Sequence, residues 1–577
     1  MRLINTSTGK LEEFIGKNIP KYAILSHTWG EEEVSFRDYV NGGQEHKKGF
    51  KKIAMTCRLA AKDGLEYAWV DTCAIDKSSS AELTEAINSM YRWYERAEVC
   101  YAFLSDLSAG AELDDALGKC RWFTRGWTLQ ELIAPRVLHF FDQKWNNRGS
   151  KFNLAKHLAD ITGIRVLVLQ GANLSNFISV AEKMSWAAKR ETTRVEDLAY
   201  ALLGIFDVNM PLLYGEEEKA FRRLQDEIVR STPDLSIFAW RLPQTGKESE
   251  YIRSRTLCGV FAESPAAFSG CRNLSSHSNF SPVEFSISNV GIKLKGHIIH
   301  SPGSHYVLPI HWGYWTSKNV LGVELRKIGP DQFLRQNPWE VLEYPLHQVV
   351  SPNSSTERHL LTKLLPTAHS PRFTMADTFV PHLRRHALQI RSPPAIALHT
   401  AWPLDCFDDQ DQIFFISDYA RGDFSSIRLR ISSPLTIHTF LSPSPVKVEF
   451  DCIFYAVGWS AGRPQCTLFD YQSNARLVNE LQFALANWAH DGRYVLEQLA
   501  FHKVPKLTRV VHRIPGTERA AVVSFKPYLE YDTIGSVICK HPYWIIDFSF
   551  ELCDGKDIPE VEQEVWDLDS NHSTKEG

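Results

Sequence analysis

YAILSHTWG, residues Tyr22–Gly30, is a short apolar run that ends at a glycine. Its apolar residues do not alternate with polar ones, a pattern typical of a strand buried on both faces of a sheet. Similar runs follow at Glu66–Ile75, Val99–Leu107 and Val137–Trp145. The sequence therefore predicts four buried strands near its beginning.

Helix-like segments separate these strands. Lys47–Leu65 carries apolar residues at helical spacing and reaches Gly64, which favours a helix end. Glu82–Ala97 is amphipathic and follows turn-forming and capping residues. Strands that alternate with helices predict a parallel sheet covered on both faces. We therefore expect an α/β domain at residues 1–150.

The pattern changes twice after residue 150. Residues 151–232 have helical spacing and predict a helical extension of the first domain. Residues 233–553 are rich in β-branched and aromatic residues, which predicts a mainly-β, sandwich-like region of one or two domains. We expect one helix in it, Ala475–Trp488, and assign it a recognition or autoinhibitory role by elimination. The acidic segment 554–577 is predicted to be disordered.

The composition is that of an ordinary globular protein. At 577 residues the chain is too long for one core. Its net charge of −4 gives no general attraction to nucleic acid or anionic lipid. The 11 cysteines form no C-x-x-C pair, and the chain has neither a signal-peptide core nor an apolar run that spans a bilayer. We therefore expect a cytoplasmic protein with reduced thiols.

Polar residues follow the first two predicted strands. Ser26, His27 and Trp29 end the first strand, and Asp71 lies late in the second. In a parallel sheet, the ligand crevice lies beyond the carboxyl ends of the strands, where the strand order reverses. The sequence therefore predicts that these residues lie around one rim of the sheet.

A glutamate follows the third strand, in RWFTRGWTLQELIAP (Arg121–Pro135). Trp127 and Glu131 are four residues apart, which predicts a shared helix face, with Arg121 and Arg125 near the carboxylate. We interpret Glu131 as a functional carboxylate at the mouth of the sheet. The structural alternative is an ion pair between Glu131 and the arginines.

The other rim residues also have two explanations. His27 either titrates near neutral pH or only caps its strand. Asp71, Cys73 and Asp76 either form a Cys-His-Asp nucleophile set with His27 or cap backbone amides around a buried thiol. A group of histidines lacks carboxylate or cysteine partners at metal-ligand spacing, so no metal is expected: His297, His300, His305 and His311.

Several long motifs together resemble the fungal heterokaryon incompatibility (HET) domain and its helical continuation, over about the first 230 residues: YAILSHTWG, YAWVDTCAIDK, ELTEAINSMYRWYERAEVCYAFLSD, RWFTRGWTLQELIAP and MSWAAKRETTRVEDLAYALLGIFDVNMPLLYGE. The resemblance implies self/non-self recognition and programmed cell death in a filamentous fungus. The chain has no phosphate-binding loop and no repeat period, so it is similar to a stand-alone member of that family.

The order of strands and helices is also similar to a Toll/interleukin-1 receptor (TIR) domain, which has a flavodoxin-like parallel sheet. In NAD-cleaving TIR domains a catalytic glutamate occupies the place that Glu131 has here, although Thr128 replaces the cysteine of that motif. The resemblance implies that Glu131 is catalytic and that NAD is a substrate rather than a bound cofactor. We expect the substrate to be held by the rim residues Ser26, His27, Trp29, Asp71, Arg121, Arg125 and Trp127.

Two functional hypotheses follow. In the first, the N-terminal domain is an enzyme that depletes NAD when it self-associates on activation, and the β-rich region restrains it or senses a partner. In the second, the domain has no catalytic activity and causes death by recruiting protein partners. Neither hypothesis requires nucleic acid or a membrane span.

Overall fold

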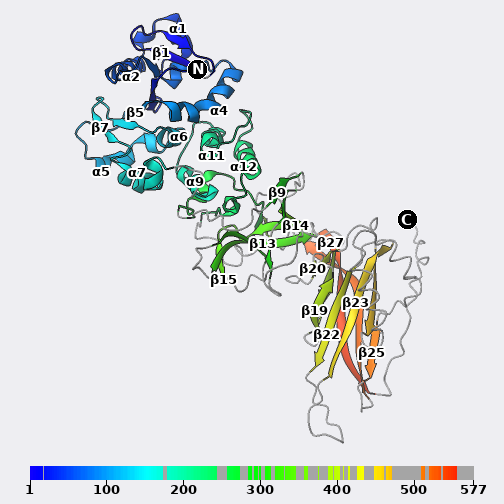
Figure 1. Cartoon of the computed structure of the whole chain (residues 1–577). Coiled ribbons are helices and arrows are strands. Elements are labelled where there is room, and N and C mark those ends of the chain that lie inside the picture. Colours follow the sequence, from blue (N-terminus) through cyan, green and yellow to red (C-terminus); the bar gives the residue numbers. More distant parts are fainter. Residues whose placement is uncertain are drawn as a thin grey trace, which may run out of the picture.

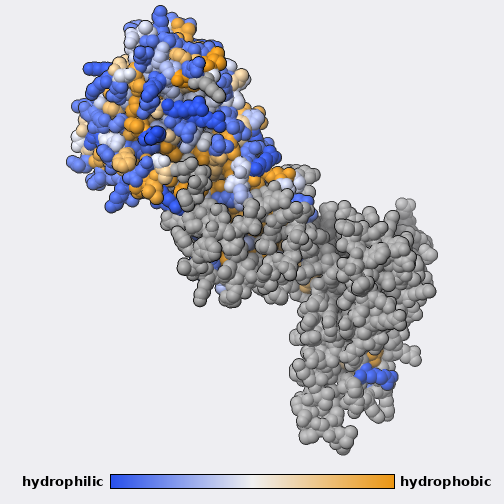
Figure 2. All heavy atoms as spheres, viewed as in Figure 1, coloured by the Kyte–Doolittle hydropathy of each residue, from blue (hydrophilic) through white to orange (hydrophobic). Residues whose placement is uncertain are grey.

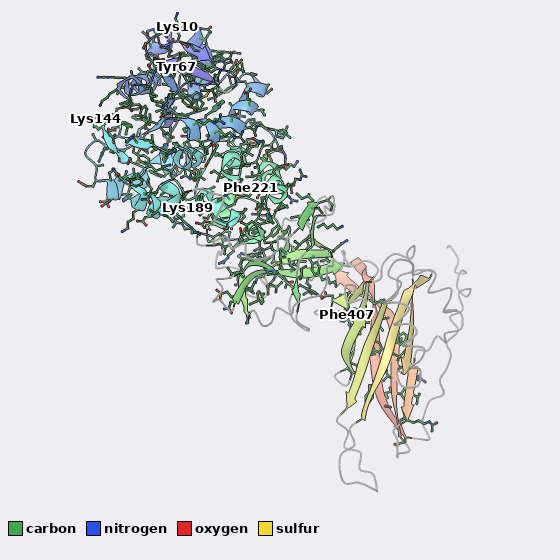
Figure 3. All side chains as sticks on the ribbon, in the orientation of Figure 1. Lys10, Tyr67, Lys144, Lys189, Phe221 and Phe407 are labelled. Carbon is green, nitrogen blue, oxygen red and sulfur yellow. The ribbon has the colours of Figure 1, made fainter. Side chains whose placement is uncertain are left out.

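Figure 1 shows the computed structural model, which describes residues 1–243 except 17 and 173–177, and residues 256–554 with gaps. The longest gaps are 361–373, 434–447 and 471–508. The predicted helix Ala475–Trp488 and residues 555–577 of the predicted acidic tail lie outside the described residues. Figure 3 shows that the described side chains are densest in the N-terminal part.

A seven-stranded sheet forms the centre of the N-terminal part, in the order β2-β1-β4-β3-β5-β6-β7. The strands are β1 (Arg2–Asn5), β2 (Leu11–Glu13), β3 (Tyr22–His27), β4 (Tyr67–Trp69), β5 (Val99–Phe103), β6 (Leu138–Phe141) and β7 (Asn147–Ser150). The neighbours β4, β3, β5 and β6 run parallel, whereas β1, β2 and β7 pair antiparallel. The predicted α/β fold with a parallel sheet is confirmed.

The strands are shorter than predicted. Glu66–Ile75 contains β4 and then a short helix, α3 (Asp71–Ala74). The N–H of Ala74 donates to the carbonyl of Val70 at 3.0 Å, which closes a helical turn directly after the strand. The sequence pattern misses β1, β2 and β7. The residues of β2 and β7 are exposed or half-buried, and β1 has only two buried residues, whereas a continuous apolar run identifies only buried strands.

Helices cover both faces of the sheet: α1 (Phe36–Asn41), α2 (Phe50–Lys62), α4 (Ser80–Arg96), α5 (Leu113–Ala116) and α6 (Thr128–Ile133). Leu25 of β3 belongs to one buried cluster with Ile53 of α2. Its neighbour Ile24 belongs to a second cluster with Met90 of α4. Because successive side chains of a strand point to opposite faces, α2 and α4 lie on opposite faces of the sheet.

A helical block follows: α7 (Ala155–Thr162), α8 (Val166–Leu169), α9 (Val180–Ala187), α10 (Asp197–Tyr200), α11 (Leu203–Phe206) and α12 (Lys219–Ser231). α11 packs directly on α4, so this block lies against the helices of the first sheet. The helical continuation predicted from the sequence is therefore present.

Gly204 makes the close approach of α11 to α4 possible. A Cβ atom at this position would lie 2.0 Å from the Cβ of Tyr91, a distance that real atoms do not adopt. We expect Gly204→Ala to lower the unfolding free energy by about 2 kcal/mol, because the two helices must separate. Chemical denaturation of the full chain measures this loss. Gly110→Ala, where no atom lies within 4 Å, is the matched control, and an equal loss in both variants would contradict the packing argument.

Beyond residue 243 the described elements are mainly strands, which form ten-, six- and four-stranded sheets. They are β8 (Thr256–Cys258), β9 (Glu284–Ile287), β10 (Ile292–Lys295), β11 (Ile299–His300), β12 (Tyr306–Trp312), β13 (Asn319–Gly329), β14 (Gln332–Gln336), β15 (Leu342–Pro345), β16 (Glu357–Leu360), β17 (Thr374–Met375), β18 (Ala387–Arg391), β19 (Ile396–Trp402), β20 (Phe407–Asp408), β21 (Ile413–Phe415), β22 (Ser425–Ser433), β23 (Val448–Ser460), β24 (Arg463–Asp470), β25 (Arg509–Arg513), β26 (Arg519–Ile534) and β27 (Val537–Asp554). The predicted mainly-β region is confirmed.

A buried arginine joins the segment that follows α12 to the ten-stranded sheet. Arg335 of β14 is fully buried, and its guanidinium donates to the carbonyls of Phe238 and Trp240 at 2.8 and 2.5 Å. The guanidinium also lies 3.9 Å from the centre of the Trp240 ring. One buried apolar cluster includes residues from Leu3 to Phe333, so the core is continuous across residue 232. The domain limits at residues 150, 232 and 553 stay predictions.

The surface of the N-terminal part carries no extended apolar area on its visible face, where hydrophilic and hydrophobic residues are interspersed (Figure 2). Among the described residues, no helix combines the length and apolar character needed to cross a membrane. The same residues contain no group of three or more His, Cys, Asp or Glu placed to hold a metal ion. His297 and His305 lie outside the described residues.

Candidate functional site

The strand order places a crevice beside β3. The chain passes from β3 to β4 on one side and then from β4 to β5 on the other side, so the order reverses between β3 and β5. In open parallel sheets, ligands bind outside the carboxyl ends of the strands at such a reversal. The carboxyl end of β3 carries Ser26 and His27, two of the predicted site residues.

Glu131 lies at this reversal point. It is on α6, and Ser26 Oγ donates to its Oε2 at 2.5 Å. Trp122 Nε1 donates to the same Ser26 hydroxyl oxygen at 2.8 Å. The hydroxyl of Tyr94 on α4 also forms a hydrogen bond with the carboxyl, and it donates to the Leu25 carbonyl at 2.9 Å. The structure therefore brings Glu131 and Ser26 together, as the sequence predicts.

The Glu131 carboxyl is protonated at neutral pH. Burial raises its pKa to about 8, and the charge of Asp71 acts in the same direction. The Ser26 hydrogen bond and the charge of Arg125 oppose the rise without overcoming it. Because Tyr94 donates elsewhere, its oxygen is free to accept a proton from the neutral acid. The neutral carboxyl is therefore compatible with both of its hydrogen-bond partners.

The prediction that Glu131 stands at an open mouth of the sheet is wrong for this conformation. Only 7 % of the residue is exposed, and every residue of α6 is buried. The helical block closes the other side of α6, where Arg190 Nη1 donates to Thr128 Oγ1 at 2.9 Å and to the carbonyl of Arg125 at 2.8 Å. A short amphipathic helix normally leaves one side exposed, but here a second layer covers that side.

The structural alternative, an ion pair between Glu131 and an arginine, is also wrong. Arg125 and Arg190 act on the carboxyl through charge alone, without a hydrogen bond. Arg121 is exposed, and its backbone N–H donates to Asp106 Oδ2 at 2.8 Å. Glu131 is thus a buried acid held by hydroxyl groups, which is unusual for a residue with a purely structural role.

The remaining rim residues form a second group next to Glu131. Trp29 Nε1 donates to Asp71 Oδ2 at 2.8 Å. His27 is 5 % exposed and lies between two carboxylates, with Nδ1 3.9 Å from Asp71 Oδ1 and Nε2 3.8 Å from Glu33 Oε2. Its Nε2 is buried and has no hydrogen-bond partner among the described residues. The predicted positions of His27, Trp29 and Asp71 at one rim therefore agree with the structure.

Two predicted roles do not agree with the geometry. Cys73 is fully buried, donates to the Val70 carbonyl at 3.6 Å, and burial raises its pKa well above the ordinary value. A buried neutral thiol does not act as a nucleophile, which excludes the Cys-His-Asp set. Trp127 precedes α6 and hydrogen-bonds Asp197 of the helical block, so its indole is engaged away from Glu131.

Lys151 fixes the end of the helix that carries Glu131. The residue is 3 % exposed, and its ammonium donates to the carbonyls of Leu132 and Ile133 at 3.1 and 3.2 Å, and to that of Pro135. Leu132 and Ile133 belong to the last turn of α6, where carbonyls lack internal donors, and Pro135 follows the end of the helix. Sequence reasoning misses Lys151 because it lies outside every motif and its contacts depend on the tertiary fold.

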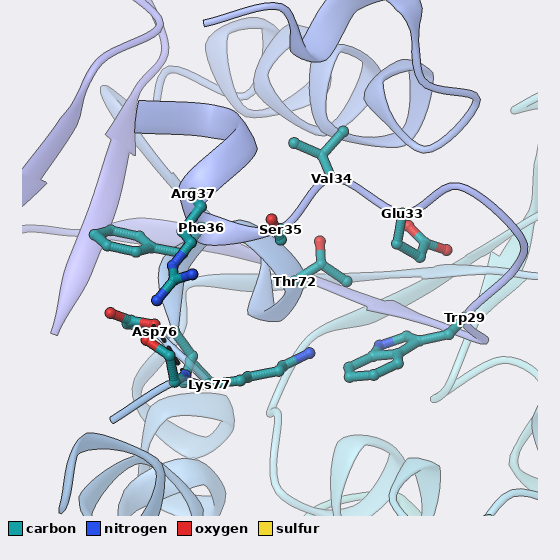
Figure 4. A pocket seen from close by; sticks show the side chains of 11 residues that line it. Trp29, Glu33, Val34, Ser35, Phe36, Arg37, Thr72, Asp76 and Lys77 are labelled. Atoms are coloured by element: carbon teal, nitrogen blue, oxygen red, sulfur yellow. Dashed lines mark hydrogen bonds between the residues drawn. The ribbon is translucent and has the colours of Figure 1, made fainter. Parts of the chain in front are cut away.

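A cavity of about 260 Å³ opens beside Trp29, on the β4 side of the rim (Figure 4). The β3–α1 loop and the α3–α4 connection form its walls. Its charged lining residues are Glu33, Arg37, Asp76 and Lys77, and Glu131 does not line it. The sequence offers no signal for Arg37 or Glu33 as site residues. Glu33 lies in the loop before α1, Arg37 lies in α1, and neither belongs to a motif.

Comparisons with known proteins bear on this part of the chain. Residues 22–119, which contain β3, α2, β4, α4 and β5, match the family model described as heterokaryon incompatibility protein (HET). The chain carries a HET domain. It is 51 % identical over 220 residues to the vegetative incompatibility protein HET-E-1 of Podospora anserina, an alignment that covers 36 % of this chain. The same alignment covers 16 % of that relative, so the chain matches about a sixth of its length.

Two further results concern the rest of the chain. Residues 219–290, from α12 of the helical block to β9, match a family model described as a domain of unknown function, DUF8212. No solved structure matches the chain at a significant level. The similarity to TIR domains stays a prediction from the sequence.

Proposed function

We propose that this HET-domain protein acts in fungal heterokaryon incompatibility and triggers programmed cell death. The match of residues 22–119 to the HET model and the identity to a vegetative incompatibility protein support this assignment. Protein partners, including further copies of the chain, are the proposed trigger. We place this activity in the cytoplasm.

The mechanism that we propose is NAD cleavage through Glu131. The observation that carries it is a carboxyl with a pKa raised to about 8, buried without an ion pair at the reversal of strand order. Strongly shifted carboxyl groups at such crevices are typical of active sites. Hydrolysis breaks the bond between ribose C1′ and the nicotinamide nitrogen, and the electron pair leaves with nicotinamide. Water then bonds to C1′ and releases a proton.

Activation requires the rim to open. In the closed conformation Glu131 is neutral and does not stabilise the cation that develops on the ribose. Exposure to water returns its pKa toward the ordinary value near 4.5, and the carboxylate then ionises at neutral pH. Exposure therefore supplies both access for the substrate and the negative charge that the transition state needs.

Nicotinamide release by the purified full chain, concentrated with a crowding agent, tests this mechanism. We expect Glu131→Gln to lower the rate by at least about a hundredfold, because the amide keeps the hydrogen bonds but carries no negative charge. Glu85→Gln, on the exposed side of α4, is the matched control and should retain the full rate. Equal NAD consumption by wild type and Glu131→Gln would remove Glu131 from the mechanism.

The second candidate is a non-catalytic domain that causes death by recruiting other proteins. The 7 % exposure of Glu131 favours it, because the closed conformation presents no carboxylate to a substrate. Death of cells that express Glu131→Gln at the wild-type rate, with no NAD loss in either strain, supports this candidate over the first.

A further inference from the structure

The cavity beside Trp29 has a distinctive charge distribution. Lys77 places its ammonium 3.3 Å from the centre of the Trp29 ring, and neither Lys77 nor Arg37 forms an ion pair with a described residue. Arg37 acts on Asp76 through charge only. Figure 4 shows the Lys77 side chain extending toward Trp29 and the Arg37 side chain extending toward Asp76. Lys77 thus contacts an aromatic ring and feels the charges of Asp71 and Glu33 only at a distance, and neither cation is in direct contact with a carboxylate among the described residues.

The two acidic residues of the cavity are already engaged. Glu33 Oε1 accepts from the Gly30 N–H at 2.8 Å and from the ammonium of Lys52. Asp76 Oδ1 accepts from the N–H and the hydroxyl of Ser78 at 2.9 and 2.6 Å. Both carboxylates therefore already accept hydrogen bonds, whereas neither Arg37 nor Lys77 donates one to a described residue. The cavity can accept an anion beside these two cations.

The size of the cavity limits what part of a ligand it holds. Sites that enclose a whole small molecule measure roughly 300 to 1,000 Å³. At about 260 Å³ this cavity holds a fragment, such as one or two phosphoryl groups with a ribose, but not a complete dinucleotide. The rest of such a ligand must extend past Trp29, whose ring also lies 5.5 Å from the Arg125 guanidinium.

Trp29 connects the cavity to Glu131. Its indole donates to Asp71, and Asp71 acts through charge on the Glu131 carboxyl. Arg125 likewise acts on both Trp29 and Glu131. An extended ligand anchored in the cavity therefore passes over Trp29 toward the buried acid.

We infer that the cavity lined by Arg37 and Lys77 binds the phosphoryl groups of a nucleotide whose remaining part lies over Trp29. The identification of a nucleotide as the carrier of the phosphoryl groups rests on the proposed function. Phosphoryl recognition itself rests on two cations that form no ion pair with a described residue, because guanidinium and ammonium groups are the usual protein partners of phosphate.

Calorimetric titration of the full chain with ADP-ribose and, separately, with inorganic pyrophosphate tests this inference. We expect both to bind, with affinity that falls as ionic strength rises. Lys77→Gln and Arg37→Gln should each weaken binding about tenfold, the loss expected for one charge-assisted contact. Lys77→Arg should restore binding to within about threefold, because it keeps the charge.

The control is Lys62→Gln. Lys62 is an exposed lysine in the last turn of α2, which leads to the amino end of β4, whereas the cavity lies beyond the carboxyl end of that strand. This variant should leave the affinity unchanged. Absence of binding for both probes, or binding that both glutamine variants leave intact, overturns the inference. Binding of pyrophosphate with the expected losses upholds the phosphoryl site even if ADP-ribose binds no more tightly. Binding that persists in a protein without NAD cleavage upholds the site and counts against the proposed mechanism only.

Discussion

Replacing Glu131 with glutamine is expected to stabilise the N-terminal domain by about 4 kcal/mol at pH 8 and to leave its stability unchanged at pH 4. The folded-state pKa of about 8 lies above the unfolded value near 4.5. Between these values the unfolded chain has lost the proton and the folded chain keeps it. Stability therefore falls as pH rises through this interval, by about 1.4 kcal/mol per pH unit. Glutamine does not ionise, so the variant lacks this decline.

Hydrogen exchange of peptides from β3 and β5 in the full chain measures the effect, because these buried strands exchange when the domain unfolds. The amide of glutamine accepts from Ser26 and donates to Tyr94, which preserves both hydrogen bonds. Parallel pH profiles for wild type and Glu131→Gln would show that the carboxyl is ionised in the folded state. Such a result would also remove the observation on which the catalytic proposal depends.

Replacing Arg165 with methionine is expected to cost about 3 kcal/mol at neutral pH. Arg165 Nε and Nη2 donate to the two carboxylate oxygens of Glu182 on α9 at 2.6 and 2.5 Å. The Glu182 side chain is fully buried, whereas that of Arg165 is 35 % exposed. Loss of one partner leaves a buried carboxylate unpaired. Its cost is limited to that of protonating the carboxyl, about 3 kcal/mol at pH 7.

Two measurements separate this effect from lost packing. The destabilisation should disappear at pH 4, where Glu182 is protonated in both the folded and the unfolded chain. The double variant with Glu182→Gln should recover most of the stability at pH 7, because no charge is then buried. Urea denaturation of the three variants gives these values. A loss that is equal at both pH values would mean that Arg165 acts through its apolar stem rather than its charge.

The sequence predicts some strands of the sheet more accurately than others. The apolar runs at Tyr22–Gly30 and Val99–Leu107 predict β3 and β5 because burial on both faces leaves a local record in every residue. The run Glu66–Ile75 predicts one long strand, but only Tyr67–Trp69 is a strand. Asp71–Ala74 forms a helical turn, and most of its residues are also buried. Burial alone does not distinguish these two conformations in a short segment.

The sequence by itself determined the parallel α/β sheet, the helical continuation, the mainly-β remainder and the rim position of Ser26, His27 and Glu131, because strand and helix patterns depend on neighbouring residues. Only the tertiary structure decided that Glu131 is closed against Ser26 and protonated, since that depends on the helical block packed over α6. It also decided that Arg37 and Lys77 share one cavity. These contacts join residues far apart in the chain, and no local pattern records how such residues meet.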